Sequence, residues 1–230
     1  KMKKVGFIGG YKKTDLLLYI AKMLIIAGKK VLVVDTTIEQ RAKYIVPSID
    51  PTFSYITNYE DIDVAIGFKE IDEIREYLAS KDPDYDYALI DIDRASTLLN
   101  FEMLNSFKNY FVTTFDLYSI KKGLETLSQI PEPMELTKII FSKEILSEEN
   151  EYLDFLSLGY KIKWDDYRVY FPFEMGDESA IIDNQRLARI KFKNLSPQYK
   201  ESLMYIEEEL LGEKEVNNFI KALKNFEKGE

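Results

Sequence analysis

The sequence contains neither cysteine nor histidine among its 230 residues. The lack of cysteine excludes disulfides, thiolate metal sites and a cysteine nucleophile. The lack of histidine excludes histidine-based catalytic triads and imidazole metal ligands. A metal site built from carboxylates is compatible with this composition, and its most natural occupant is Mg²⁺ held partly by phosphate oxygens.

A broad basic surface is also missing, because 31 lysines and arginines face 40 aspartates and glutamates and the net charge is −9. We therefore do not expect a broad surface for nucleic acid, and nucleic acid is not an expected partner, although the composition is compatible with a local basic patch. The apolar segment Leu16–Ala27 is interrupted by Lys22 and is shorter than the roughly 20 residues that a membrane span needs. It follows a strand and has no small-residue cleavage site, so we do not interpret it as a signal peptide. We expect a cytoplasmic protein, with peripheral attachment at the inner face of the membrane as a further option.

Segments typical of strands and helices alternate along the chain. Apolar runs predict strands at Lys4–Ile8, Lys30–Asp35, Tyr85–Asp91, Tyr110–Thr114, Leu136–Phe141 and Tyr167–Phe171. Helices are predicted at Lys13–Ala27, Lys69–Ser80, Thr97–Phe107, Leu117–Ile130, Leu146–Leu158, Ser179–Ile190, Pro197–Leu211 and Lys214–Lys228. The segment Ile38–Glu60 is predicted to be a loop with short irregular pieces. This alternation predicts a single α/β domain over residues 1–230, with a doubly wound, mainly parallel sheet flanked by helices in three layers.

The first loop has the residue types of a phosphate-binding loop. Gly9, Gly10, Lys13 and Thr14 follow a predicted strand and precede a predicted helix. Such a loop needs glycines so that backbone N–H groups can surround phosphates, a lysine for the β- and γ-phosphates, and a hydroxyl for Mg²⁺. The amino end of the helix adds a favourable dipole. Other polar side chains follow the later strands, at the sheet edge where ligands bind in such folds: Asp35, Asp91, Thr113–Asp116 and Ser142–Glu144.

These residues resemble those of the ParA/MinD family, the deviant Walker A ATPases of the SIMIBI class. The family loop reads Lys-Gly-Gly-x-Gly-Lys-[Ser/Thr]-[Ser/Thr], and this chain has Ile8-Gly9-Gly10-Tyr11-Lys12-Lys13-Thr14-Asp15. Further segments resemble the family in order and spacing: Val31–Thr37 (its second strand), Tyr85–Asp91 (its Walker B strand), Phe111–Gly123, and Phe171–Glu174 with Glu178–Ile182. The resemblance implies a P-loop NTPase fold, ATP or ADP with Mg²⁺ as cofactor, and a homodimer.

The resemblance also implies roles for individual residues. The implied nucleotide-binding residues are Gly9, Gly10, Tyr11, Lys12, Lys13, Thr14, Asp15 and Ser142. The implied Mg²⁺ ligands are Thr14, Asp35 and Asp91. Several of them have a simpler alternative. Lys13 and Thr14 could be a helix start without a ligand, Asp35 and Asp91 loop-capping carboxylates, and Asp15 a first-turn acid that suits the helix dipole. Lys12 is equally compatible with a solvated surface lysine.

The chain departs from the family pattern at several functional positions. Ile8 replaces the signature lysine that reaches the partner subunit's nucleotide, Lys12 replaces a loop glycine, and Asp15 replaces a hydroxyl residue. Thr37 replaces the aspartate linked to water activation, and Ser142 replaces the base-reading asparagine. Because phosphoryl transfer depends on positioning and charge neutralisation, we expect weak or absent ATP hydrolysis and assign no catalytic residue.

These departures favour a pseudo-ATPase, for which the TadZ/CpaE group attached to pilus and secretion systems is the most similar. The expected role is a localisation or assembly factor that recruits or positions a larger machine through protein partners. Two alternatives remain at this point. One is an active ParA/MinD-type ATPase in plasmid or chromosome partition or cell-division positioning, and the other is a doubly wound domain without a nucleotide.

The carboxyl-terminal segment Lys214–Lys228 predicts an amphipathic helix. Its apolar residues are Val216, Phe219, Ile220, Leu223 and Phe226, and lysines occupy other positions. MinD-like proteins resemble this in carrying a carboxyl-terminal helix that lies on membranes, and phenylalanines flanked by lysines suit an interfacial helix. The alternatives are a helix docked on the domain and a helix that binds a protein partner.

Overall fold

The computed structural model describes residues 2–47, 53–144, 147–172, 174 and 176–229. The strands are β1 Lys3–Ile8, β2 Val31–Asp35, β3 Tyr55–Tyr59, β4 Ile62–Ile66, β5 Tyr87–Ile92, β6 Lys108–Thr113, β7 Met134–Phe141 and β8 Ile162–Phe171. The helices are α1 Thr14–Ile26, α2 Ala42–Ile45, α3 Ile71–Tyr77, α4 Ala95–Asn100, α5 Leu117–Thr126, α6 Ser147–Ser157, α7 Asp177–Leu187, α8 Pro197–Leu211 and α9 Glu213–Gly229. A 3₁₀ turn, η1, covers Met103–Asn105.

The strands form one sheet in the order β3-β4-β2-β5-β1-β6-β7-β8. Neighbouring strands are parallel except β3 and β4, which are antiparallel. From β1 the chain extends the sheet in one direction through β2 and β4, and after β5 it crosses β1 to extend the other side. Ligands bind at such a reversal of strand order, beyond the carboxyl ends of the strands. The first loop, which follows β1, lies at this position.

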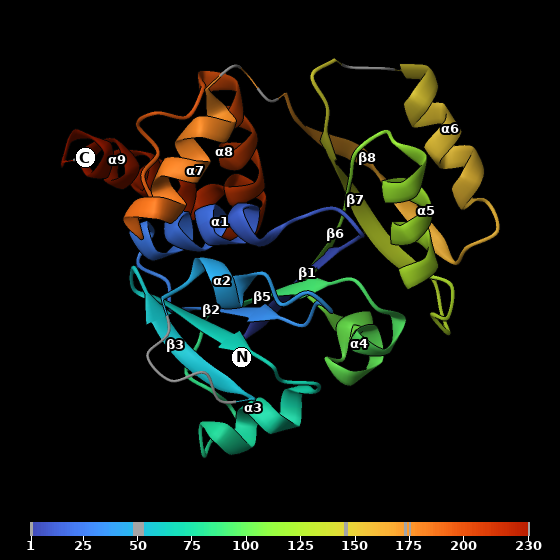
Figure 1. Cartoon of the computed structure of the whole chain (residues 1–230), viewed down its shortest axis with the longest axis horizontal. Coiled ribbons are helices and arrows are strands. Elements are labelled where there is room, and N and C mark those ends of the chain that lie inside the picture. Colours follow the sequence, from blue (N-terminus) through green and yellow to red (C-terminus); the bar gives the residue numbers. More distant parts are fainter. Residues whose placement is uncertain (1, 48–52, 145–146, 173, 175, 230) are drawn as a thin grey trace.

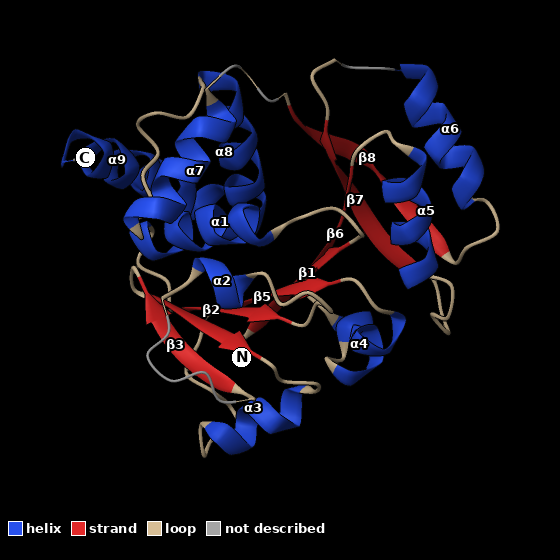
Figure 2. Ribbon diagram, in the orientation of Figure 1, coloured by secondary structure: helices blue, strands red, loops and turns tan. Residues whose placement is uncertain are grey.

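Helices cover both faces of the sheet (Figures 1 and 2). Along β1, Phe7 packs in the cluster formed with α1, α2, α7, α8 and α9, whereas Ile8 packs in the opposite cluster with α3, α4, α5 and α6. Val33 and Val34 of β2 alternate in the same way, as the two-residue period of a strand requires. Burial on both faces explains the continuous apolar runs of the central strands. The predicted three-layer, mainly parallel α/β fold is confirmed.

The prediction of a loop over Ile38–Glu60 is wrong in part. Tyr55–Tyr59 forms β3, which pairs with β4, a strand that we did not predict. The connecting residues Glu60 and Asp61 both have left-handed backbones, with φ of 54° and 68°, as in the two-residue turn of a tight hairpin. Such turns usually contain asparagine and glycine, so two acidic residues carry no comparable signal. Residues 48–52 of this segment lie outside the described part of the chain.

Several other boundaries differ from the predictions, two of them substantially. The helix predicted over Thr97–Phe107 ends at Asn100, and Glu102 with a φ of 56° separates it from η1. The strand predicted at Tyr167–Phe171 begins earlier, at Ile162, and its pairing with β7 contains an irregularity. The predicted helix start at Leu146 and the motif residue Phe173 lie outside the described residues.

The carboxyl-terminal helix α9 docks on the domain. Phe219 and Leu223 are buried in the cluster that contains α1 and α8, and the Phe226 ring contacts Phe192. Ion pairs flank this contact, with Lys29 Nζ 2.6 Å from Glu215 Oε2 and Lys200 Nζ 3.0 Å from Glu227 Oε1. The apolar face that resembles a membrane anchor therefore packs inside the molecule.

None of the helices in the described ranges has the length and apolar character that a bilayer crossing requires.

Candidate functional site

Packing fixes the glycines of the first loop. The backbone N–H of Gly9 donates a hydrogen bond to Ile92 O (3.0 Å), and Gly9 has a φ of +151°. A Cβ atom at Gly9 would lie 2.2 Å from Val112 O of β6, and one at Gly10 would lie 2.8 Å from Lys122 Cγ. Backbone conformation and close approach therefore require glycine at position 9 whether or not a phosphate binds.

The side chain of Lys13 turns back onto its own loop. Lys13 is 3% exposed, and its Nζ donates hydrogen bonds to Gly9 O (2.6 Å) and to Tyr11 O (3.2 Å). Nζ also lies 2.9 Å from Asp91 Oδ1. A lysine ammonium has three protons and no acceptor capacity. Two of its protons are therefore taken by backbone carbonyls, and the ammonium forms an ion pair with Asp91.

Asp91 is the penultimate residue of β5 and is 3% exposed. Burial raises the pKa of Asp91 to about 6, because the protein interior disfavours the charged form. The nearby ammonium of Lys13 opposes this rise, while the negative charges of Asp35 and Asp93 add to it. The Lys13–Asp91 ion pair therefore only partly offsets the cost of burying the carboxylate.

Asp35 organises the loop that follows β2. Its Oδ1 accepts hydrogen bonds from the backbone N–H (3.0 Å) and the hydroxyl (2.6 Å) of Thr37, and its Oδ2 accepts one from Ala42 N–H (2.9 Å). Thr37, which stands in place of an aspartate, is thus a donor to Asp35. This is the loop-capping arrangement that we gave as the alternative to a metal-ligating role for Asp35.

The amino end of α1 retains features that suit an anion. Among the described residues, the buried Oγ1 of Thr14 has no hydrogen-bond partner, and no side chain caps the helix start at Lys13. Free N–H groups and the helix dipole favour negative charge at this position. Hydroxyl and carboxylate oxygens, such as those of Thr14 and Asp91, are the ligand types that a phosphate-bound Mg²⁺ uses.

The described ranges contain no group of three or more acidic side chains arranged to hold a metal ion. A Mg²⁺ at this loop would consequently depend on phosphate oxygens and water for most of its ligands.

The remaining predicted residues have different surroundings. Ile8 is fully buried in the core, and Lys12 is exposed. Asp15 Oδ1 accepts a hydrogen bond from Gln185 Nε2 of α7 (2.8 Å), and burial raises the pKa of Asp15 while this hydrogen bond opposes the rise. Ser142, after β7, donates its hydroxyl to Glu144 O (2.6 Å) and so shapes its own loop.

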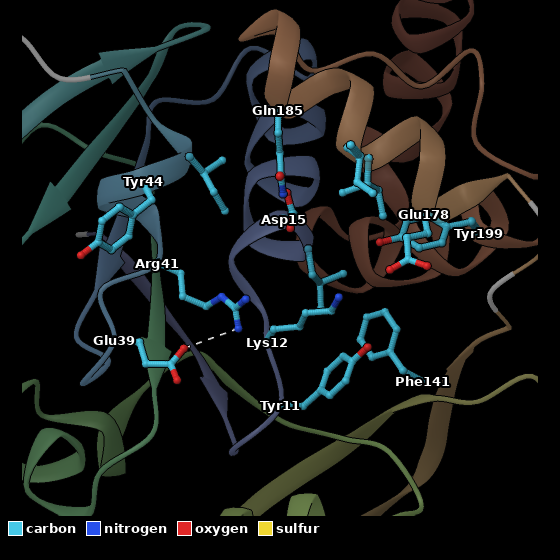
Figure 3. Close-up of a pocket in the computed structure, with 14 residues that line it drawn as sticks. Tyr11, Lys12, Asp15, Glu39, Arg41, Tyr44, Phe141, Glu178, Gln185 and Tyr199 are labelled. Atoms are coloured by element: carbon cyan, nitrogen blue, oxygen red, sulfur yellow. Dashed lines mark hydrogen bonds and ion pairs between the residues drawn. The ribbon is translucent and has the colours of Figure 1, made fainter.

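A cavity of about 610 Å³ opens over the first turn of α1, between the loop after β2 and helix α7 (Figure 3). Its lining residues are Tyr11, Lys12, Asp15, Leu16, Glu39, Arg41, Tyr44, Ile45, Phe141, Glu178, Ile181, Ile182, Gln185 and Tyr199. Sequence reasoning identified Tyr11, Lys12 and Asp15 but missed most of the others. The ends of β2 and β7 were the available signal, since parallel strands deliver their following loops to one edge.

Comparison with known proteins supports the fold only. No protein-family model matches the sequence, and no curated protein is similar to it. Several solved structures are similar over most of their length. They include the MinC:MinD cell division complex of Aquifex aeolicus (16% identity, 93% of this chain and 97% of that chain, TM-score 0.55), a ParA family ATPase of Chlorobium tepidum TLS (13%, 96% and 98%, 0.52) and a complex of a Cyanothece McdA variant with ATP (10%, 92% and 97%, 0.57). At these identities the chain shares the fold of MinD and of a ParA family ATPase.

Proposed function

We propose that this protein is a degenerate ParA/MinD-like protein, most similar to the TadZ/CpaE group, with weak or absent ATP hydrolysis. Its role would be that of a localisation or assembly factor for a larger cellular machine of the pilus or secretion type, acting through protein partners. The observation that carries this proposal is the inward position of the Lys13 ammonium, which contacts Asp91, Gly9 O and Tyr11 O.

The position of Lys13 makes phosphate binding costly. To reach a phosphate, Nζ would have to leave these acceptors and leave the Asp91 carboxylate buried without its cation. Breaking a buried pair in this way costs about 3–5 kcal/mol, since an unpaired charge stays inside the protein. The interactions of the phosphate with the loop would have to exceed this cost for net binding to result.

Two replaced positions argue against hydrolysis. Ile8, at the signature lysine position, is part of the apolar core, so no side chain at this position reaches a partner subunit's nucleotide. Thr37, at the position of the water-activating aspartate, donates to Asp35 and has no carboxylate to orient water. Charge neutralisation and water positioning are the main sources of catalysis in phosphoryl transfer.

A nucleotide with Mg²⁺ remains the best candidate ligand of the loop if it binds a phosphate. Thr14 and Asp91 would then hold the metal, and the free N–H groups at the start of α1 would face the phosphates. Mg²⁺ would neutralise phosphate charge. Asp35 fits this group less well, because Thr37 and Ala42 already donate to both of its oxygens.

The second candidate is an active ParA/MinD-type ATPase in plasmid or chromosome partition or in cell-division positioning. The unpartnered Thr14 Oγ1 favours it, as does the fold shared with McdA, whose structure is a complex with ATP. A domain that binds no nucleotide is the third candidate. The three differ in affinity for ATP and in hydrolysis rate.

Calorimetric titration with ATP and ADP in the presence of Mg²⁺ tests these alternatives, together with a phosphate-release assay. We expect weak or undetectable binding by the native protein and hydrolysis far slower than that of an active ParA-type ATPase assayed in parallel. Lys13→Ala should abolish any binding, whereas Lys12→Ala, at the exposed neighbouring lysine, is the matched control. Hydrolysis at the rate of the active enzyme would contradict the proposal.

The assembly role needs a test in cells. A fluorescent fusion of the native protein should occupy a defined position, and Lys13→Ala should leave that position unchanged. Any homodimer should form to the same extent with and without ATP in analytical ultracentrifugation. A position or a dimer that disappears with Lys13→Ala, in a variant that circular dichroism shows to be folded, would instead favour a working nucleotide cycle.

A further inference from the structure

The cavity over α1 is lined by the loop residues that depart from the phosphate-binding pattern. Lys12 and Asp15 contribute to its lining together with Tyr11, whereas the retained Lys13 and Thr14 are not among its described lining residues (Figure 3). The substituted positions thus line a cavity that Lys13 does not line. We propose that this cavity binds a small organic cation with an apolar body, such as an aromatic amidinium or ammonium compound, and not a polyphosphate.

Acidic side chains outnumber basic ones around the cavity. Asp15, Glu39 and Glu178 contribute carboxylates, and Lys12 and Arg41 contribute cations. Arg41 lies at the rim, where its Nη1 is 3.5 Å from Glu39 Oε2. Asp15 is the carboxylate closest to the helix start. It is partly buried and keeps its orientation through the hydrogen bond to Gln185 (Figure 3). A desolvated carboxylate attracts a cation and repels each phosphate group.

An aromatic wall closes one side of the cavity. The Tyr11 ring lies 4.9 Å from that of Phe141, and the two are adjacent in Figure 3. Phe141 stacks on Phe171, whose ring in turn meets Tyr199 edge to face, each pair at 4.9 Å between centroids. This chain of contacts holds Tyr11, Phe141 and Tyr199 in fixed positions along the cavity. Phe141 and Tyr199 are buried at 6% and 1% exposure, whereas Tyr11 is partly exposed, so a ligand would meet the Tyr11 ring. Ring faces attract cations, and aromatic side chains are a usual recognition surface for organic ammonium groups.

The size of the cavity agrees with a small ligand. Its volume of about 610 Å³ falls within the range of roughly 300–1,000 Å³ that holds cofactors and drug-sized molecules. Leu16 and Ile181 add apolar surface for the body of the ligand. The arrangement therefore has three complementary parts: the Asp15 carboxylate for the cation, the Tyr11 ring for its flank, and aliphatic side chains for the rest.

Lys12 distinguishes a cationic ligand from an anionic one. It is exposed, it lines the cavity, and its charge acts on Asp15. Its ammonium would compete with a bound cation for the Asp15 carboxylate but would attract a phosphate. Removing the charge of Lys12 should consequently strengthen the binding of a cation and weaken that of a nucleotide. The two kinds of ligand predict effects of opposite sign for one substitution.

The test uses 4-aminobenzamidine, a fluorescent aromatic cation, and its neutral analogue 4-aminobenzamide, titrated into the full chain. We expect the amidine to bind at least about tenfold more tightly than the amide, a difference equal to about 1.4 kcal/mol. Asp15→Asn removes the negative charge and should lower the affinity for the amidine by about tenfold. The side-chain oxygen of the asparagine can still accept the hydrogen bond from Gln185, so the local structure should be kept. Lys12→Met should raise it severalfold. Asp183→Asn, an exposed acid of α7 outside the cavity, is the matched control.

Equal affinity for the two probes, no effect of Asp15→Asn, or weaker amidine binding by Lys12→Met would each overturn the inference. Circular dichroism should show that the variants are folded. Tyr11→Leu provides a second variant, which should weaken amidine binding because it removes the Tyr11 ring. The inference rests on the proposed function only in assuming that the loop holds no triphosphate. ATP hydrolysis by the native protein would contradict that function, whereas failure of the amidine to bind would overturn the cavity assignment alone.

Discussion

The ammonium of Lys13 lies 2.9 Å from the carboxylate of Asp91, and both side chains are almost completely enclosed, with 2% and 4% of their surfaces exposed. The pair joins the start of α1 to the end of β5. In this position Lys13 contributes to the stability of the fold, and Asp91 keeps a raised pKa in spite of it. The same contact that stabilises the loop keeps its lysine from solvent, so loop stability and phosphate binding are in competition.

The first prediction concerns Lys13→Met. At pH 8 the substitution should lower the free energy of unfolding by about 3 kcal/mol, because Asp91 loses its cation while remaining buried. Asp91 has a pKa of about 6 in the folded protein against a model value of 3.8. The protonated carboxyl therefore favours folding below about pH 4, and this contribution is lost as the pH rises through about 6. The destabilisation by Lys13→Met should accordingly be much smaller at pH 5.

Urea denaturation of the native protein and of Lys13→Met at pH 5 and pH 8 measures this difference. The double variant Lys13→Met/Asp91→Asn should recover most of the stability at pH 8, since it removes the buried charge. Lys12→Met, at an exposed position, should change stability by no more than about 0.5 kcal/mol. A destabilisation by Lys13→Met that is equal at both pH values would contradict the role assigned to the ion pair.

Glu207 of α8 provides a second prediction. It is 0% exposed, neither carboxylate oxygen has a hydrogen-bond partner within the described structure, and burial raises its pKa well above the ordinary value. Its contribution to stability is therefore present below the ordinary pKa and is lost as the pH rises. Glu207→Met should stabilise the protein by about 2 kcal/mol at pH 8, because it removes an uncompensated polar group.

The gain from Glu207→Met should shrink strongly at pH 4, where the carboxyl is neutral in the folded chain and mostly neutral in the unfolded chain. Thermal unfolding at the two pH values measures it. The neighbouring Glu208 is exposed, so Glu208→Met is the control and should have little effect at either pH. A Glu207→Met variant that is less stable than the native protein at pH 8 would indicate a hidden partner for this carboxylate.

Gly9→Ala tests whether the loop glycine is required by packing. Its φ of +151° is unfavourable for alanine, and the added Cβ would meet the Val112 carbonyl oxygen at 2.2 Å. We expect a loss of about 3 kcal/mol or more, the sum of backbone strain and a forced displacement of β1 from β6. Gly159→Ala is the control, because no atom lies within 4 Å of the added Cβ. If Gly9→Ala were as stable as the control, the loop glycine would have to be explained by ligand binding alone.

The sequence was sufficient to predict the central sheet and the position of the first loop. Uninterrupted apolar runs such as Val31–Val34 indicate strands that are buried on both faces, and Gly9, Lys13 and Thr14 lie close together in the chain. Information of this kind is local. The hairpin of β3 and β4 escaped prediction because its turn residues, Glu60 and Asp61, have an unusual identity for left-handed backbones.

The interior of the candidate site could not be predicted, because its contacts are distant in sequence. Gln185 donates to Asp15 across 170 residues. Nothing in the spacing of either residue indicates that α7 packs beside the start of α1. The inward position of Lys13 depends in the same way on Asp91, which β5 delivers from the middle of the chain. Residue type identified these groups as candidates, but only the tertiary packing determines whether they face a cavity or one another.

The last prediction concerns α9, whose apolar face packs on the domain. Phe219 is 2% exposed and belongs to the same core cluster as residues of α1 and α8. Phe219→Ala should therefore destabilise the protein by about 3–4 kcal/mol, from lost burial and the cavity left behind. Lys221→Ala, on the exposed side of α9, should change stability by less than about 0.5 kcal/mol.

Urea denaturation measures both variants, and sedimentation with anionic phospholipid vesicles separates docking from a membrane role. A docked helix keeps Phe219 inside the protein, so the native protein should not sediment with vesicles. Interfacial binding depends instead on apolar residues reaching the lipid boundary. If the native protein sedimented with vesicles and Phe219→Ala abolished this without lowering stability, α9 would leave the domain at a membrane. Loss of stability without vesicle binding would identify α9 as part of the core that holds α1 and its loop in place.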